Sequence, residues 1–286
     1  MLDFTLIICI VRGYTRVKKV VNIFAYKDLI NHCTVDLDGR HHLESNCVYI
    51  FNHSINIKSL VLTGDIELRG RPKSDVTITL TSPGVSISSY DLNLFTLRNL
   101  KIKSKSKTSL FDLRGAIVRL SNCVLRARRL GRVDLKNLSI HDVIFNGFNS
   151  GFTIVKLSTL VAKYLRGTNL TGAFIDLSGM VSKCKVTMKD LKLVENINGN
   201  LELIRVETKV DNNTYVSPNI EDPDLFELKD IELSVKSVNS YKTILSPRDK
   251  IITGYCYRDD AEFIYQPYRF TNRIDLSAVS SRSIYG

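Results

Sequence analysis

The stretch FTLRNLKI at residues 95–102 recurs in outline as VDLKNLSI at 133–140 and as FELKDIEL at 226–233. Each copy alternates apolar and polar residues on both sides of one small polar residue. Such alternation is typical of strands that bury one side, because successive side chains of a β-strand point to opposite faces. A small polar residue between two alternating runs predicts a tight turn that joins two strands.

A shortened form of this pattern, Leu-x-polar-apolar-x-apolar, occurs along much of the chain. Its clearest copies are IKSLVL (57–62), LRNLKI (97–102), LSNCVL (120–125), LKNLSI (135–140), MKDLKL (188–193) and LKDIEL (228–233). The apolar residues that lead the repeats are 16 to 27 positions apart: Phe95, Phe111, Val133, Phe152, Phe174, Leu201 and Phe226. A drifting interval near twenty predicts a solenoid, since every turn needs the same inward apolar residues while its loops can lengthen.

Residues 23–235 resemble the pectin-lyase-like parallel β-helix superfamily in the order of their segments. A short helix predicted in IFAYKDLINHC (23–33) precedes the first strands. Small polar residues that match the family's stacked turn residues then recur at Asn99, Asn122, Asn137, Asp190 and Asp230. The resemblance implies an all-β chain that folds as a single-stranded right-handed parallel β-helix, with an N-terminal capping helix and a C-terminal cap or tail. A β-sandwich is the alternative, because period-two alternation serves either fold.

We expect three regions along the chain. Residues 1–45 form an N-terminal cap region, residues 46–240 the parallel β-helix, and residues 241–286 a tyrosine-containing C-terminal cap or tail. The apolar run Phe4–Val11 has no basic residues before it and is too short to span a bilayer, which favours a buried strand or end cap over a signal sequence. No stretch approaches transmembrane length, so we expect a soluble protein, with a virion or extracellular setting left open.

Residues that could support catalysis or metal binding are sparse. Of the catalytic patterns that the resemblance implies, the sequence matches only one fragment, Asp259-Asp260. The best candidates for acid–base chemistry are the neighbours His141 and Asp142. Adjacent coils could bring the acids Asp112 and Asp134 near them. Histidines and cysteines gather at His32, Cys33, His41, His42, Cys47 and His53 in a spacing that fits no zinc framework. We predict no catalytic residue, no metal site and no cofactor. The six cysteines are far apart and are interpreted as mostly buried free thiols, with disulfides left open.

Charge is the strongest functional signal in the sequence. The formal net charge is +11 with a pI near 9.3, which favours polyanionic partners. The segment from Lys101 to Lys136 contains eleven basic residues and only two acidic ones. The predicted polyanion-binding residues are Lys101, Lys103, Lys105, Lys107, Arg119, Arg126, Arg128, Arg129 and Arg132. The four lysines alternate with other residues, so an extended segment would point them to one side, and arginines from the next coil would join them.

These observations favour a non-enzymatic structural or adhesive β-helix, a component of a virion or another large assembly, that binds polyanions or partner subunits through a basic face. Acidic residues concentrate between Glu195 and Glu232, so copies of the chain could also associate with one another through opposite charges. The alternatives are a polysaccharide lyase or glycoside hydrolase that acts on acidic polysaccharide, and a nucleic-acid-binding protein.

Overall fold

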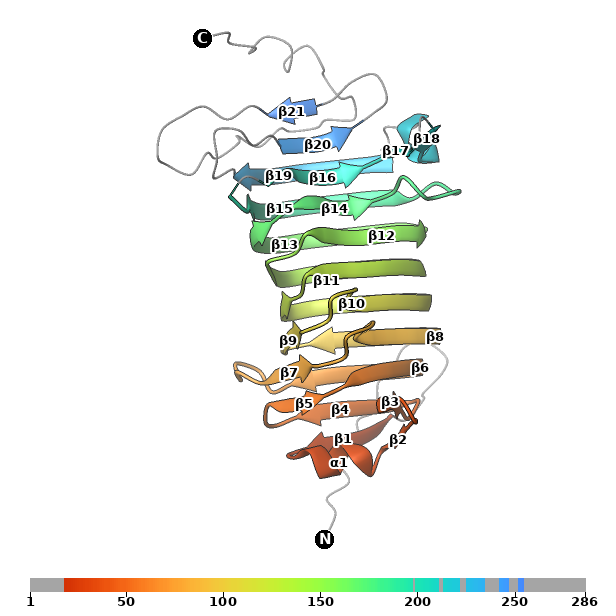
Figure 1. Ribbon diagram of the computed structural model, residues 1–286, viewed down its shortest axis with the longest axis vertical. Coiled ribbons are helices and arrows are strands. Elements are labelled where there is room, and N and C mark those ends of the chain that lie inside the picture. The colour runs from red at the N-terminus through yellow and green to blue at the C-terminus, as the bar shows by residue number, and fades with distance from the viewer. Residues whose placement is uncertain are drawn as a thin grey trace.

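The computed structural model describes residues 18–197, 199–210, 213–221, 225–234, 242–246 and 252–254 of the chain. These residues form a parallel β-solenoid of about seven turns, in which the strands lie one above another along the long axis (Figure 1). The predicted all-β parallel β-helix is thereby confirmed. The β-sandwich is excluded, because the strand pairs that join one solenoid turn to the next are parallel. Antiparallel pairs among the described strands are the hairpins β2–β3, β17–β18 and β20–β21.

The first half of the described chain holds one short helix and the early strands. Their bounds are β1 (Lys19–Ile23), α1 (Tyr26–Ile30), β2 (Cys33–Val35), β3 (Arg40–Leu43), β4 (Cys47–Phe51), β5 (Ile55–Ile57), β6 (Ser59–Gly70), β7 (Thr77–Leu80), β8 (Ile87–Arg98), β9 (Lys101–Ser104) and β10 (Phe111–Arg126). The second half continues with β11 (Arg129–Asn146), β12 (Ser150–Lys156), β13 (Thr159–Leu170), β14 (Gly172–Asp176), β15 (Lys185–Glu195), β16 (Leu201–Arg205), β17 (Glu207–Val210), β18 (Asn213–Val216), the 3₁₀ helix η1 (Pro218–Glu221), β19 (Phe226–Ser234), β20 (Lys242–Ser246) and β21 (Ile252–Gly254).

Each turn contributes one segment to each of three stacks of parallel strands. Stack 1 holds β1, β4 and the second halves of β6 and β8, and it continues through 117–121, 137–141, 159–163, 185–189 and 226–229. Stack 2 holds β5, β7 and β9, and it continues through 124–126, 144–146, 166–168 and 192–194. Stack 3 holds β3, the first halves of β6 and β8, the first parts of β10 and β11, and then β12, β14, β16 and β20.

The core consists of columns of apolar side chains that point inward at the same register position in successive turns. One column of stack 1 contains Tyr49, Leu68, Leu97, Leu120, Ile140, Ala162 and Met188, all fully or almost fully buried. Four phenylalanines, Phe145, Phe148, Phe152 and Phe174, pack against one another in the middle of the solenoid. This stacking explains the repeat, because each turn must place an apolar residue over the one below it.

From the β6–β7 connection onward, the corner between stack 1 and stack 2 contains one residue with a positive φ in each turn. Four of the six predicted repeat copies place their polar residue there, with φ between 49° and 55°: Asn99, Asn122, Asp190 and Asp230. Asn and Asp tolerate this left-handed conformation better than most residues. The Asn122 amide also donates to Asn99 Oδ1 at 2.8 Å. Asn137 does not belong to this set, since it lies within β11 in register with Ile117 and Thr159.

Helix α1 lies at the N-terminal end of the stack and is shorter than the stretch predicted for it (Figure 1). Ile23 belongs to β1 and Cys33 to β2, so the helix is limited to five residues, of which only Leu29 is buried. Its role as a cap stays a prediction. Strand β1 pairs with β4, so the parallel stack reaches into the region expected to be a cap. Most of 241–286 lies outside the described residues, as do Phe4–Val11 and Asp259-Asp260.

Candidate polyanion-binding face

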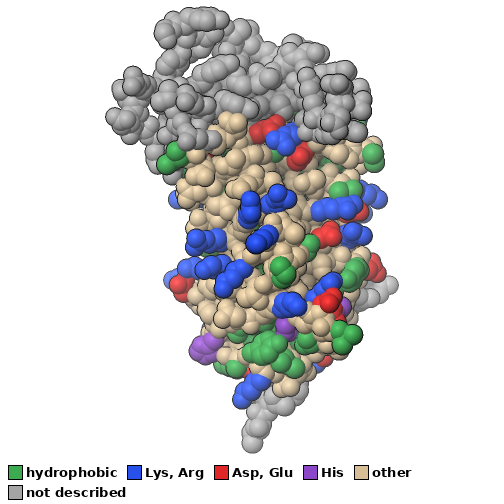
Figure 2. Space-filling view, in the orientation of Figure 1, with side chains coloured by type: hydrophobic (Ala, Val, Ile, Leu, Met, Phe, Trp, Pro, Cys, Tyr) green, Lys and Arg blue, Asp and Glu red, His purple; other side chains and the backbone are tan. Residues whose placement is uncertain are grey.

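Stack 2 and the corners that follow it form a surface without acidic residues over four consecutive turns. We call this surface the basic face and define it as residues 101–110, 124–128, 144–149 and 166–171. It contains no Asp or Glu and seven cations: Lys101, Lys103, Lys105, Lys107, Arg126, Arg128 and Arg166. Six of these side chains are exposed and Lys101 is half-buried. Lys and Arg side chains also dominate the middle of the stack in the view of Figure 2.

Two strands bring predicted cations together on the basic face. Lys103 on β9 stands in register with Arg126 on β10. Neighbouring strands are about 4.8 Å apart, so these two positive charges face each other across one strand spacing. Lys101, on the same side of β9, pairs with the carboxylate of Asp75. It is the only cation of the basic face in an ion pair with an acid among the residues that the structure describes.

The other predicted cations divide between the basic face and stacks 1 and 3. Lys105 and Lys107 follow β9 at the corner toward stack 3, and Arg128 follows β10 at the same corner. Arg119 lies on stack 1 between Thr96 and Ser139. Arg129 and Arg132 lie on stack 3, at the start of β11. The structure therefore places six of the nine predicted residues on the basic face and adds Arg166, which sequence reasoning missed. Only the register of β13 with β11 shows that Arg166 belongs to this face, opposite Ile144.

Stack 3 carries its charges in a different arrangement. Arg132 stands in register with Asp112, and Arg205 with Asp176. Arg205 also contacts Glu202 at 2.7 Å and Asp176 at 3.5 Å. Opposite charges on neighbouring strands stabilise a sheet, whereas like charges directly opposite destabilise it. Stack 3 thus sets acids opposite its cations, whereas Lys103 and Arg126 on the basic face stand opposite each other with no acid in register.

The acid–base candidates do not converge on one site. Asp112 and Asp134 lie on stack 3, where Asp134 stands in register with Arg114 and Lys156. His141 lies on the outside of stack 1, and Asp142 occupies the following corner with φ of 53°. The nearest ring to His141 is Tyr164, at 5.1 Å between centroids. The two carboxylates of stack 3 are therefore separated from the His141-Asp142 pair by a change of stack.

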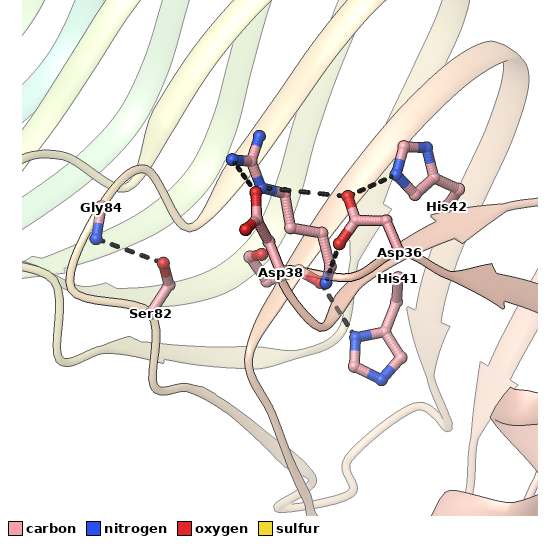
Figure 3. Close-up of polar contacts among 8 residues, drawn as sticks. Asp36, Asp38, His41, His42, Ser82 and Gly84 are labelled. Carbon is pink, nitrogen blue, oxygen red and sulfur yellow. Dashed lines mark hydrogen bonds and ion pairs between the residues drawn. The ribbon is translucent and has the colours of Figure 1, made fainter.

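The histidine-rich segment near the N-terminus forms closed polar contacts (Figure 3). His42 Nε2 donates to Asp36 Oδ2 at 3.0 Å, and this bond is the main reason why the pKa of Asp36 lies below its ordinary value. Arg40 joins the same turn through its backbone N–H to Asp36 Oδ1 and its guanidinium to Asp38. These contacts close the hairpin turn between β2 and β3.

His41 and Ser82 take part in separate contacts in the same view (Figure 3). The buried His41 binds the Ser59 carbonyl oxygen through Nδ1 and the Tyr26 hydroxyl through Nε2. Ser82 Oγ accepts a hydrogen bond from the N–H of Gly84. Both residues lie in the loop after β7, away from the histidine-rich segment. Within the described ranges, no three His, Cys, Asp or Glu side chains are grouped so that they could hold a metal ion. The segment therefore has a structural explanation in its own hydrogen bonds.

Comparisons with family models, curated proteins and solved structures return no match to this chain. In the part of the chain that the structure describes, helices are too short or too polar to cross a bilayer.

Proposed function

We propose that this protein is a non-enzymatic, structural β-helix that binds polyanionic partners through the basic face, as part of a larger assembly. The observation that carries the proposal is that the basic face, which extends over four consecutive turns, holds seven cations and no Asp or Glu. A surface needed only for solubility is served by mixed charges, as on stack 3. Lys103 and Arg126 stand opposite each other, and two like charges in this position lower the stability of the solenoid. This cost favours a functional reason for the arrangement.

The geometry supports recognition by charge along the axis of the solenoid. Lys101, Lys103, Arg126 and Arg166 lie on strands of stack 2, and successive strands of a stack are about 4.8 Å apart. A linear polyanion that lies along the axis would meet Lys103, Arg126 and, two turns later, Arg166. Such binding releases counterions, so affinity falls steeply as salt rises, by a slope of about 0.7 to 0.9 per neutralised anionic group.

The experiment compares two double variants of equal charge change. K103Q/R126Q removes two cations from the basic face, and R119Q/R132Q removes two from stacks 1 and 3. Binding of fluorescent dextran sulfate and of a duplex DNA is measured between 50 and 200 mM salt. We expect K103Q/R126Q to weaken binding about tenfold at the lowest salt and to reduce the salt slope by about 1.4 to 1.8, with less than a twofold effect of the control on affinity.

Two results would overturn the proposal. If both double variants lose the same affinity, binding reflects the net charge of the chain and has no defined face. If the unmodified protein binds neither probe at the lowest salt, the basic face does not recognise polyanions. Far-UV circular dichroism of each variant checks that the solenoid is retained.

A further inference from the structure

Tyr164 departs from the usual residue types at the corner between stack 1 and stack 2. From the β8–β9 connection onward, six successive turns place a positive-φ residue there, namely Asn99, Asn122, Asp142, Tyr164, Asp190 and Asp230, and the longer β6–β7 connection before them contains Lys73 with a φ of 60°. Five of these six are Asn or Asp, the residues other than glycine that accept this conformation most readily. Tyr164 adopts a φ of 55° despite its bulky side chain. Residues held in such sparsely populated conformations cluster at binding sites, where another demand outweighs the strain.

The side chain of Tyr164 has no role in the core that would explain its presence. Tyr164 is 47% exposed and meets the edge of His141 from the turn below, with ring planes at 76°. Ile144, two residues beyond Asp142 in that lower turn, is 45% exposed and stands in register with Arg166. An aromatic and an aliphatic side chain are therefore both presented to solvent on adjacent turns, at the border of the basic face.

Charged groups surround this apolar pair. Lys163 precedes Tyr164 on β13, and Arg166 follows it two residues later. The acids nearby are the corner residues of the adjacent turns, Asp142 below and Asp190 above, and Asp190 contacts Lys189 at 3.7 Å. We call the set His141, Ile144, Lys163, Tyr164 and Arg166 the Tyr164 patch. It has an apolar centre and a mainly cationic rim.

We propose that the Tyr164 patch docks an acidic segment of a partner protein, with an apolar side chain of that segment buried against Tyr164 and Ile144. The electrostatic part of this inference rests on the proposed function of the basic face. The burial of an apolar side chain against Tyr164 and Ile144 does not depend on it. Protein interfaces combine an apolar centre with a polar rim and are enriched in Tyr and Arg. Charge complementarity with the cationic rim selects an acidic segment.

Two features of the patch favour a protein partner over other polyanions. The exposed Ile144 offers apolar area that a phosphate or sulfate group cannot use. Proteins that bind single-stranded nucleic acid stack successive bases on several aromatic rings. Among the described residues, the other exposed aromatics are Phe24 and Tyr26 at the N-terminal end and Tyr90 on β8, before stack 1. None of these extends the Tyr164 patch into a row of stacking platforms.

Two decapeptide probes of equal charge separate the contribution of apolar side chains to binding from the contribution of charge. Probe A is EDEDLFEDED and probe B is EDEDSSEDED, each with a fluorescent label, and binding is measured by anisotropy at 50 mM salt. We expect the unmodified chain to bind A about tenfold more tightly than B, the gain from burying one or two apolar side chains. Tyr164→Asn and Ile144→Ser should each remove most of this preference and leave the affinity for B within twofold.

Tyr90→Asn is the matched control, because Tyr90 is another exposed tyrosine on a different corner, and it should keep the preference for A. Since Asn accepts a positive φ better than Tyr does, Tyr164→Asn should also leave the melting temperature unchanged or raised. Equal binding of A and B by the unmodified chain would overturn the inference while leaving the basic face intact. A lower melting temperature of Tyr164→Asn with the preference unchanged would assign Tyr164 to the fold alone. A Tyr164-dependent preference for dextran sulfate or single-stranded DNA over probe A would also overturn the choice of partner.

Discussion

Lys103 and Arg126 stand directly opposite each other on neighbouring parallel strands, and both side chains are exposed. Neither is paired with a carboxylate in the described part of the chain. Two like charges at one strand spacing repel each other, so this register position lowers the stability of the solenoid slightly. The same position concentrates positive charge where a polyanion could neutralise it. Stability and binding therefore make opposite demands on these two residues.

Lys103→Glu should separate the two demands. The new carboxylate would face Arg126, and we expect the free energy of unfolding to rise by roughly 0.5 kcal/mol while affinity for dextran sulfate falls. Urea denaturation and anisotropy measure the two effects. Arg119→Glu is the control, since its register neighbours Thr96 and Ser139 are uncharged and no new pair forms. A loss of stability in Lys103→Glu would contradict the assigned register.

Gly131 should be among the least replaceable residues of the chain. Its φ is +115°, and a Cβ there would lie 2.0 Å from the carbonyl oxygen of Phe111 in the turn below. Gly131→Ala is therefore expected to cost at least about 2 kcal/mol of stability. Gly179, where a Cβ would meet nothing within 4 Å, is the matched position, and Gly179→Ala should change stability by less than about 0.5 kcal/mol. Equal urea midpoints for the two variants would refute the close stacking of β10 and β11.

The N-terminal end should lose stability between neutral and mildly acidic pH. Burial lowers the pKa of His41, although its bond to Ser59 and the nearby Asp36 act in the other direction. The unfolded chain then binds a proton more readily than the folded chain. Stability is therefore full above the ordinary histidine value of about 6.5 and falls as the pH drops below it.

Urea unfolding at pH 7.5 and pH 5.0 measures this dependence. The free energy of unfolding should differ less between pH 7.5 and pH 5.0 in His41→Gln than in the unmodified chain. Asp36 does not affect this comparison. Its pKa is lowered, so its contribution to stability is lost only at a pH below the ordinary carboxylate range. A pH dependence in His41→Gln equal to that of the unmodified chain would show that another group is responsible.

The buried cysteines should resist alkylation until the solenoid unfolds. The four described cysteines, Cys33, Cys47, Cys123 and Cys184, are free, which agrees with the prediction of mostly buried thiols. Burial raises the pKa of Cys123 to about 11 and that of Cys184 to about 12, so thiolate is scarce at pH 8. Cys33 is only half-buried.

Iodoacetamide at pH 8 should therefore label Cys33 before Cys123 or Cys184, as followed by peptide mass mapping. Urea should abolish the difference and provides the control for intrinsic reactivity. Native labelling of Cys184 as fast as that of Cys33 would contradict its burial between turns.

The repeat pattern predicted the class of fold but not the position of every turn. FTLRNLKI and FELKDIEL occupy the same corner, with Asn99 and Asp230 in the left-handed conformation. VDLKNLSI starts on stack 3 and ends on stack 1, so it spans a different corner. Any place where one inward strand turns into the next can carry the same alternation. The pattern therefore cannot say which of the three corners a copy occupies.

The candidate site was predictable in part for a related reason. Lys101 and Lys103 are two residues apart, so the strand period alone places them on one side. Arg166 and Tyr164 are far from them in sequence and join that region only through the register of three successive turns. Arg119 and Arg132 lie within the same basic run, yet the corners between stacks turn them to other surfaces.

The sequence by itself determined that this chain buries alternating apolar residues in a repeating β-structure and that it carries an excess of positive charge in its middle. Both properties are local, since they depend on residue type and on spacings of two residues. Only the tertiary structure decided which charges are uncompensated, because pairing depends on the side chain one turn away. A turn here contains about twenty to thirty residues, as the column Ile66, Phe95, Val118, Leu138 and Leu160 shows. Small changes in corner length therefore shift the register, and the register sets whether Arg132 meets Asp112 or Lys103 meets Arg126.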